Sequence, residues 1–309
     1  MRLDPSRIYL RGSLGRLTGE VDVLKITPRG YCHGVVDAIR IAKHVGEETQ
    51  GPVHMLGLLV HNTHVTDEMQ EHGVKLVDAE DRMAGLDKIK EGTVIFTAHG
   101  VSPAVKEKAR AMGLNAVDAT CSDVIRTHDL IDRLVADGYQ VVYIGLRGHP
   151  EPEGAIGHGP GRVHLVQEAA DIESLQIESE KVAITCQTTL SVWDTDDLID
   201  KVRLRYPQAE VHNEICRATQ ERQEAAVEAA KEVDLVIVVG STRSSNSKRL
   251  VEVVEKKGGK PAHLIDTLEE IDPEWFRGVR RVGVTSGAST PSQLTRKVIE
   301  FLQELEPPA

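Results

Sequence analysis

Aromatic residues are scarce in this 309-residue chain, which contains three Phe, two Trp and five Tyr, 3% of the total. Its apolar cores must therefore be built from Val, Ile, Leu and Ala, the side chains typical of buried parallel strands covered by helices. Hydrophobic runs are short, and none approaches the roughly 18 apolar residues of a transmembrane helix. We expect no membrane partner, and the length fits two or three compact units.

Basic residues are also in deficit, because 37 Lys and Arg stand against 48 Asp and Glu, a formal net charge of −11. No Lys/Arg-rich block is present, so we expect no nucleic-acid partner. Residues 1–20 carry several Arg but no apolar segment follows them. We interpret residues 1–21 as an N-terminal extension and not as a signal peptide.

Cysteine is limited to Cys32, Cys121, Cys186 and Cys216. Four cysteines are too few for a disulfide scaffold in a chain of this size. Without an export signal they indicate a reducing compartment, and we expect a cytoplasmic protein. In such a compartment thiols serve as metal ligands or pack in cores.

Three of the cysteines open equivalent segments of the sequence. Cys32, Cys121 and Cys216 each precede a stretch with apolar residues at helical spacing. Each stretch is followed by two apolar strands that end in polar loops. These strands are expected within residues 53–62 and 93–100, 141–151 and 182–189, and 233–246 and 281–289. The chain thus repeats one unit three times.

Strands that alternate with helices form right-handed βαβ units and parallel sheets. The sequence therefore predicts an α/β protein with three pseudo-equivalent lobes in a pseudo-threefold arrangement around one central site. The predicted lobes are residues 22–118, 119–213 and 214–305, followed by a tail at 306–309.

Three cysteines at equivalent helix starts are hard to explain as isolated core residues. The N–H groups and dipole of a helix N-terminus stabilise a thiolate, which should lower the thiol pKa and favour metal ligation. Zinc accepts three thiolates, but its paired C-x-x-C spacing is absent. An iron–sulfur cluster that bridges three lobes better suits ligands so far apart, and a missing fourth thiolate leaves one iron open. Cys186, in a predicted strand, is interpreted as a core residue.

The polar loops carry side chains suited to holding an anion. His61, His99 and His149 occupy matching positions, and imidazole can donate to phosphate without a large net charge. Hydroxyl and amide groups follow the strands of the third lobe at Ser244, Ser245, Asn246 and Ser289. Because ligands of parallel sheets bind beyond the carboxyl ends of the strands, these residues predict one anion site.

Glu151, in the segment HPEPEG, is an acid at a point where the other two lobes have none. Such a carboxyl is suited to relaying a proton. The residues alone leave two other classes of protein open. One is an iron–sulfur sensor or electron carrier without turnover, and the other is a zinc hydrolase with ligands from His61, His99 and the cysteines.

The motifs, taken in chain order, resemble those of a known family. They are PRGYCHGV (28–35), VHN (60–62), AHGV (98–101), DATC (118–121), GHPEPEG (148–154), QTTLS (187–191), ICRAT (215–219), SSNS (244–247) and GAS (287–289). The ordered set resembles the 4-hydroxy-3-methylbut-2-enyl diphosphate reductases, the LytB/IspH family, from about Asp22 to Leu305. The resemblance implies a trefoil of three α/β lobes around one 4Fe-4S cluster per chain, found as 3Fe-4S where the open iron is lost.

The resemblance also implies a reaction, the reductive removal of the allylic hydroxyl from (E)-4-hydroxy-3-methylbut-2-enyl diphosphate. The products are isopentenyl and dimethylallyl diphosphates, in the last step of the methylerythritol phosphate pathway. The implied electron donor is a ferredoxin or a flavodoxin.

The motifs carry the family's site residues onto this chain. Cys32, Cys121 and Cys216 would ligate the cluster, Glu151 would donate the proton, and Thr188 would lie beside the substrate hydroxyl. The diphosphate would be held by His61, His99, His149, Ser244, Ser245, Asn246 and Ser289. The chain departs from the family pattern at His33 and Cys186 and in a longer N-terminal extension. The two substitutions bear on redox tuning and oxygen sensitivity and not on the reaction.

Overall fold

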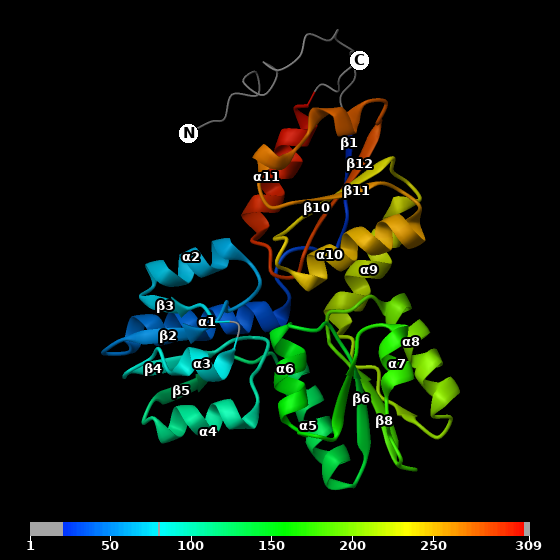
Figure 1. The fold of residues 1–309 in the computed structure, drawn as a ribbon. Helices are drawn as coiled ribbons and strands as arrows, with labels where there is room; N and C mark the ends of the chain where they lie inside the picture. The colour runs from blue at the N-terminus through cyan, green and yellow to red at the C-terminus, as the bar shows by residue number, and fades with distance from the viewer. Residues whose placement is uncertain (1–20, 80, 306–309) are drawn as a thin grey trace. The chain divides into compact units, whose positions relative to one another are not determined.

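The computed structural model describes residues 21–79 and 81–305, and these residues contain three four-stranded sheets (Figure 1). Every strand pair in the sheets is parallel. The described residues divide into one compact unit, Cys32–Gln220, and a second made from residues 21–31 and 221–305. The predicted extension and tail, apart from Val21, lie outside the described residues.

The unit Cys32–Gln220 holds two of the sheets. The first sheet has the order β3-β2-β4-β5. Its strands are β2 (Val53–Leu56), β3 (Val74–Val77), β4 (Thr93–Phe96) and β5 (Asn115–Asp118). Its helices are α1 (His33–Glu48), α2 (Thr63–Glu71), α3 (Arg82–Leu86) and α4 (Pro103–Ala111).

The second sheet has the order β7-β6-β8-β9. Its strands are β6 (Gln140–Ile144), β7 (Val163–Val166), β8 (Val182–Cys186) and β9 (Glu210–Val211). Its helices are α5 (Ser122–Ala136), α6 (Pro150–Gly157), α7 (Ala169–Ser174) and α8 (Val192–Arg205). Alternate residues of β6 face opposite cores, since Val141 and Tyr143 pack with residues of α5 while Val142 and Ile144 pack with residues of α8. Both faces of the sheet are therefore covered by helices, as parallel sheets require.

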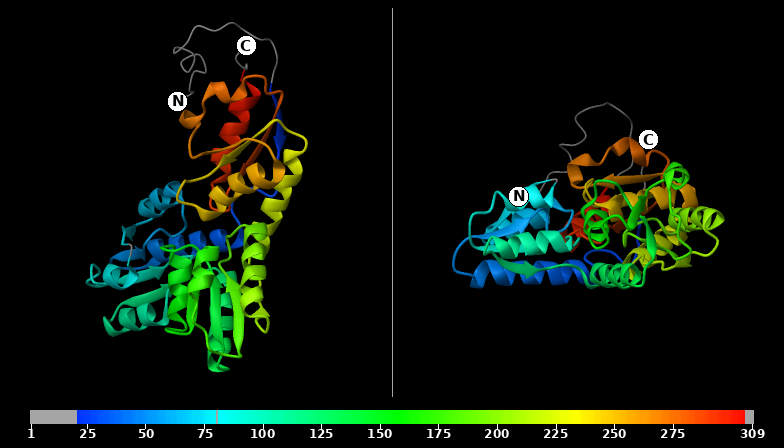
Figure 2. Two further views of the ribbon diagram at one scale, coloured as in Figure 1. Left: turned by 45° about the vertical axis from the view of Figure 1, so that its right-hand side comes forward. Right: turned by 60° about the horizontal axis from the view of Figure 1, so that its bottom comes forward.

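The other unit holds the third sheet, with the order β1-β12-β10-β11. Its strands are β1 (Asp22–Lys25), β10 (Leu235–Val239), β11 (Ala262–Ile265) and β12 (Arg281–Ser286). Its helices are α10 (Ser245–Val253), α11 (Ser292–Gln303), the C-terminal part of α9 (Arg217–Ala230) and the short turns η2 (Val254–Gly258), η3 (Leu268–Glu270) and η4 (Pro273–Phe276). Residues of α11 cover one face of the sheet, and residues of α9 and α10 cover the other (Figure 2).

The prediction of an α/β protein with three equivalent lobes is confirmed by the strand orders. Counted in each sheet from the edge strand β3, β7 or β11, the strand that follows the cysteine helix (β2, β6 or β10) is in the second position, and its successor along the chain is that edge strand. The fourth position is taken by β5, β9 and β1, which lead along the chain to Cys121, Cys216 and Cys32.

The predicted start of the first lobe at residue 22 is wrong, because β1 pairs with β12 of the third sheet, Asp22 opposite Arg281. No strand follows β12 within the described residues, and the fourth position of the third sheet is filled by β1. The edge strands β3, β7 and β11 were not predicted from the sequence, and each is four residues long.

Within residues 21–79 and 81–305, no helix has both the length and the apolar character needed to cross a bilayer.

Candidate active site

Three cysteines lie at helix N-termini, as predicted. Cys32 and Cys121 are the N-cap residues of α1 and α5, and Cys216 directly precedes α9. All three belong to the unit Cys32–Gln220 and are free thiols. The side chains of Cys32 and Cys121 make no capping hydrogen bond, so both sulfurs are available as ligands.

The three thiols are close enough to interact electrostatically. The Cys32 thiolate would raise the pKa of both Cys121 and Cys216, after the larger effect of burial on each. Helix α1 also approaches Cys121 directly, because a Cβ placed on Gly34 would lie 2.3 Å from Cys121 Sγ. Only glycine at this position allows the two cysteine segments to meet. Three convergent thiols with one coordination position left over fit a 4Fe-4S cluster with an open iron.

Burial is the largest influence on the pKa of Cys121 and of Cys216. It raises the pKa of Cys121 to about 12, although the backbone N–H groups of Asp123 and Val124 act in the opposite direction. The prediction that the helix N-termini give a lowered thiol pKa is therefore wrong, since desolvation outweighs the helix. A thiolate forms here when a metal replaces the proton, and ligand binding is then coupled to proton release.

Cys186 lies in the core, which confirms its interpretation as a strand residue. It ends β8, is fully buried, and packs in the core that includes Ile199 and Val202 of α8. Its Sγ lies 3.5 Å from Asn213 Oδ1, beneath the turn that leads to Cys216.

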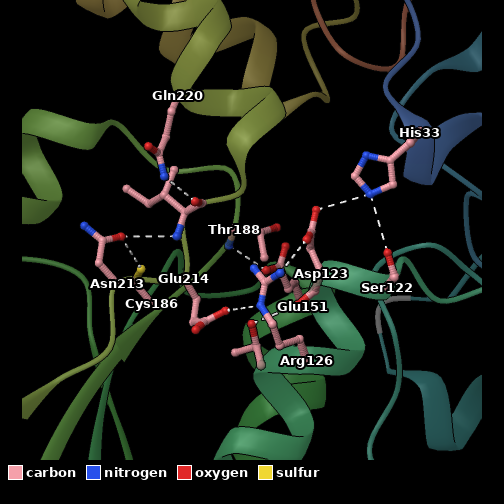
Figure 3. A network of polar contacts seen from close by, with 12 residues as sticks. His33, Ser122, Asp123, Arg126, Glu151, Cys186, Thr188, Asn213, Glu214 and Gln220 are labelled. Carbon is pink, nitrogen blue, oxygen red and sulfur yellow. Dashed lines mark hydrogen bonds and ion pairs between the residues drawn. The ribbon is translucent and has the colours of Figure 1, made fainter.

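A charged network connects the three cysteine segments (Figure 3). Arg126 of α5 donates from Nη1 to Asp123 Oδ1 at 3.0 Å and from Nε to Glu214 Oε2 at 2.8 Å. The other Asp123 oxygen, Oδ2, lies 3.4 Å from His33 Nε2. Asp123, Arg126 and Glu214 were not predicted from the sequence, where the only local signal is that Asp123 and Glu214 each lie two residues from a cysteine.

The three predicted anion-binding histidines meet at one place in the same unit. The ring centroids are 4.2 Å apart for His61 and His99, 4.8 Å for His61 and His149, and 5.2 Å for His99 and His149. Burial, together with the neighbouring imidazoles and Arg82, lowers the pKa of His149 to about 3 and that of His99 well below its usual value. Both rings are therefore neutral at physiological pH.

Hydrogen bonding fixes the orientation of His149. Its Nδ1 accepts the backbone N–H of Glu151 at 3.2 Å as the N-cap of α6, so the proton of the neutral ring is on Nε2. That nitrogen can donate to an anion but cannot ligate a metal while it carries the proton. His99 Nε2 is buried and has no hydrogen-bond partner among the described residues. These features favour an anion at this place over the zinc ion of a hydrolase. The three histidine nitrogens are nonetheless close enough together to hold a metal.

Arg82, near the histidines, was also not predicted from the sequence. Its Nη1 donates to the carbonyl oxygen of Leu56, and the guanidinium occupies the space that a Cβ on Gly57 would fill. Its positive charge lowers the pKa of His99 and His149. The guanidinium therefore places a positive charge near His99 and His149 that does not depend on their protonation.

Glu151 is buried in the second position of α6, only 2% exposed. Burial raises its pKa to about 7, against the lowering effect of hydrogen bonds from the backbone and side chain of Thr188. The Thr188 N–H donates to Glu151 Oε1 at 2.7 Å, and the Thr188 carbonyl accepts the N–H of Cys216 at 3.0 Å. One residue thus connects the carboxyl with a cysteine segment.

The predicted hydroxyl and amide donors lie in the other unit. Ser244 is the N-cap of α10, and Ser245 and Asn246 form its first turn, where helix N–H groups favour anions. Asn246 Oδ1 accepts the N–H of Ala288 at 3.0 Å, which joins this loop to the loop of Ser289. All four predicted side chains of this unit are buried.

Comparison with known proteins adds the family. A sequence model described as "LytB protein" matches residues 23–303. The chain belongs to the LytB family. It is 58% identical over 287 residues to a 4-hydroxy-3-methylbut-2-enyl diphosphate reductase of Symbiobacterium thermophilum, covering 92% of this chain and 97% of that one. It is 53% identical over 288 residues to the enzyme of the same name from Brevibacillus brevis, covering 93% of both.

Solved structures of LytB-family enzymes share the fold. The E-1-hydroxy-2-methyl-but-2-enyl-4-diphosphate reductase of Plasmodium falciparum superposes with a TM-score of 0.86 at 30% identity, covering 91% of this chain and 87% of that one. A structure titled as (E)-4-hydroxy-3-methyl-but-2-enyl diphosphate reductase, the terminal enzyme of the non-mevalonate pathway, gives 0.65 at 34% identity, with 92% and 100% covered. These similarities confirm the family and fold that the motifs predicted.

Replacing Cys32, Cys121 or Cys216 by Ser should each abolish a stable cluster in this LytB-family chain, because three convergent ligands leave none to spare. Cys186→Ser is the matched control, since its sulfur packs in the β8 core, and it should keep nearly all the iron. Iron and sulfide per chain after anaerobic reconstitution measure both. A Cys186→Ser protein as poor in iron as the other three would overturn the ligand assignment.

Asn246→Asp tests the anion site without removing a structural contact. Aspartate keeps an oxygen that can accept the Ala288 N–H, but it replaces the amide donor with a negative charge. The KM for the diphosphate should rise by about 5- to 150-fold, the effect of about 1–3 kcal/mol expected for an unmet phosphate contact. The visible spectrum of the cluster should not change. An unaltered KM would show that this loop is only a turn.

Proposed function

We propose that this protein reductively dehydroxylates (E)-4-hydroxy-3-methylbut-2-enyl diphosphate to isopentenyl and dimethylallyl diphosphates, the last step of the methylerythritol phosphate pathway. The reaction consumes two electrons and two protons, breaks the allylic C–O bond, forms a C–H bond and releases water. The observation that carries the proposal is the contact of Thr188 with Glu151 on one side and with the Cys216 segment on the other. It connects a carboxyl of raised pKa with a cysteine segment.

A 4Fe-4S cluster held by Cys32, Cys121 and Cys216 supplies the electrons when bound and, at its open iron, a site for the substrate hydroxyl. Glu151 holds a proton near neutral pH, because its pKa is raised to about 7. We assign it as the donor that converts the leaving hydroxide into water. Thr188 orients that carboxyl through its N–H group and is assigned a place beside the substrate hydroxyl.

The diphosphate is assigned to His61, His99 and His149 in one unit and to Ser244, Ser245, Asn246 and Ser289 in the other. A neutral imidazole donates to a phosphate oxygen from the nitrogen that carries its proton. In His149 this nitrogen is Nε2, because Nδ1 accepts the N–H of Glu151. Fixing the diphosphate holds the short carbon chain in place, which is a positioning effect. We assign a ferredoxin- or flavodoxin-type protein as electron donor and, from the free thiols, the cytoplasm as the compartment.

An anaerobic assay tests the proposal against its alternatives. Protein purified without oxygen should be brown, and with a chemical reductant it should convert the hydroxylated diphosphate into both products. A brown protein without turnover would indicate an electron carrier or sensor. A colourless protein that contains zinc would indicate the hydrolase.

Glu151→Gln keeps the shape of the side chain and an oxygen for the Thr188 N–H, but it cannot supply a proton. We expect kcat to fall by about 10²–10⁴-fold while iron content and KM stay near those of the parent. In the parent, kcat should fall as the pH rises through about 7, where the carboxyl loses its proton. If the Gln variant turns over as fast as the parent, Glu151 is not the proton donor, and the role passes to Thr188 or to a bound water.

The raised pKa of Glu151 also predicts how stability depends on pH. Between its usual value of 4.5 and about 7 the folded protein keeps a proton that the unfolded chain has lost. The free energy of unfolding contributed by this group therefore falls across that interval, by up to about 3 kcal/mol. Chemical denaturation of parent and Glu151→Gln at pH 5 and pH 8 measures the difference. Equal pH dependence in both proteins would exclude a raised pKa.

A further inference from the structure

The charged network of Figure 3 joins three segments that each carry a cysteine. Asp123 and Arg126 belong to the first turns of α5, after Cys121. Glu214 lies two residues before Cys216, and His33 directly follows Cys32. Arg126 contacts Asp123 and Glu214 through different nitrogens, Nη1 and Nε. One guanidinium therefore bridges the Cys121 and Cys216 segments, and the second oxygen of Asp123 extends the network to His33.

The two carboxylates in this network are more buried than the arginine. The side chains of Asp123 and Glu214 are 14% and 16% exposed, whereas that of Arg126 is 55% exposed. An exposed ion pair contributes little to overall stability. Two largely buried carboxylates without a cation are costly, however, because their charge is poorly solvated. Arg126 is thus the cation that compensates the charge of these two carboxylates beside the cysteines.

The charge of Asp123 reaches the reacting groups. It acts electrostatically on Cys121, on Cys216 and on Glu151, in each case disfavouring additional negative charge. Reduction adds an electron to the cluster that these thiols would hold, so uncompensated carboxylates here would oppose it. The guanidinium of Arg126 offsets that charge.

We propose that Arg126 is a positioning residue for the iron–sulfur cluster, which fixes the Cys121 and Cys216 segments to each other and offsets the charge of Asp123 and Glu214. This inference rests on the proposed function in one respect, the assignment of the three cysteines as cluster ligands. The inference has two parts. The geometric part is the pair of contacts from Arg126 to Asp123 and Glu214, and the electrostatic part is the positive charge of the guanidinium. Lysine retains the charge but cannot reproduce the two separate N–H contacts of the guanidinium, so Arg126→Lys separates the parts.

The test uses full-length protein reconstituted anaerobically, with two readouts, the rate of iron loss to a chelator and the midpoint potential of the cluster. Arg126→Met should lose iron about fivefold faster than the parent, as expected for a lost ion pair, and its potential should shift downward. Arg126→Lys should also lose iron faster but keep a potential close to that of the parent. Asp123→Asn, which removes a negative charge, should shift the potential upward.

Arg133→Met is the matched control, because Arg133 is an exposed arginine two turns further along α5, and it should change neither readout. Parent-like iron loss and potential in Arg126→Met would overturn the inference. A midpoint potential that shifts in the same direction in Arg126→Met and Asp123→Asn would also overturn it. The two variants remove opposite charges, so an effect of charge must shift the potential in opposite directions, whereas disturbed packing need not. If Arg126→Met fails to fold, Arg126→Lys and Asp123→Asn still decide both parts. A parent protein without an iron–sulfur spectrum would instead refute the cofactor assignment.

Discussion

Parallel strand pairing is the constraint on which the functional residues depend. It places the carboxyl ends of neighbouring strands at one edge of a sheet, where the helix N-termini also lie. Asn62 after β2 caps α2, and His149 after β6 caps α6, so the turns that start these helices also hold the histidines. The fourth strands β5 and β9 lead to Cys121 and Cys216 at the same kind of edge. In both sheets of the unit Cys32–Gln220, a cysteine, a histidine and a helix N-terminus therefore lie at the carboxyl ends of the strands, and no long loop is needed to place them there.

Desolvation gives the site its chemical character. The same burial lowers the pKa of His99 and His149 and raises the pKa of Glu151 and Cys121. Each of these groups is pushed toward its neutral form, so the site in the unit Cys32–Gln220 contains neutral imidazoles and a carboxyl of raised pKa beside its ion pairs. These properties suit the proposed binding of an anion through N–H donors and the proposed release of a proton near neutral pH. Arg82 and Arg126 supply the positive charges, each held by specific oxygen partners.

Much of the fold was readable because its signals are local. Cys121 followed by Val124, Leu130, Ile131 and Leu134 has helical spacing, and these apolar residues are the buried ones in α5. The apolar runs of β6, β8, β10 and β12 were readable for the same reason, since central parallel strands are buried on both faces. Edge strands have no such run, and β5 and β9 are mostly exposed. The assignment of β1 to the third sheet needed a pairing across most of the chain, which no local pattern reports.

The sequence by itself determined the repeat, the three cysteine positions and the identity of the polar strand ends, because each is encoded in a few consecutive residues. Only the tertiary structure decided the properties that depend on neighbours distant in sequence. The pKa of Glu151 depends on its burial and on Thr188, the proton position of His149 depends on a helix cap, and the network of Arg126 depends on Glu214. The helix-start cysteines suggested lowered thiol pKa values, yet burial reverses the direction. Desolvation is a property of the surrounding fold, so no motif could have predicted it.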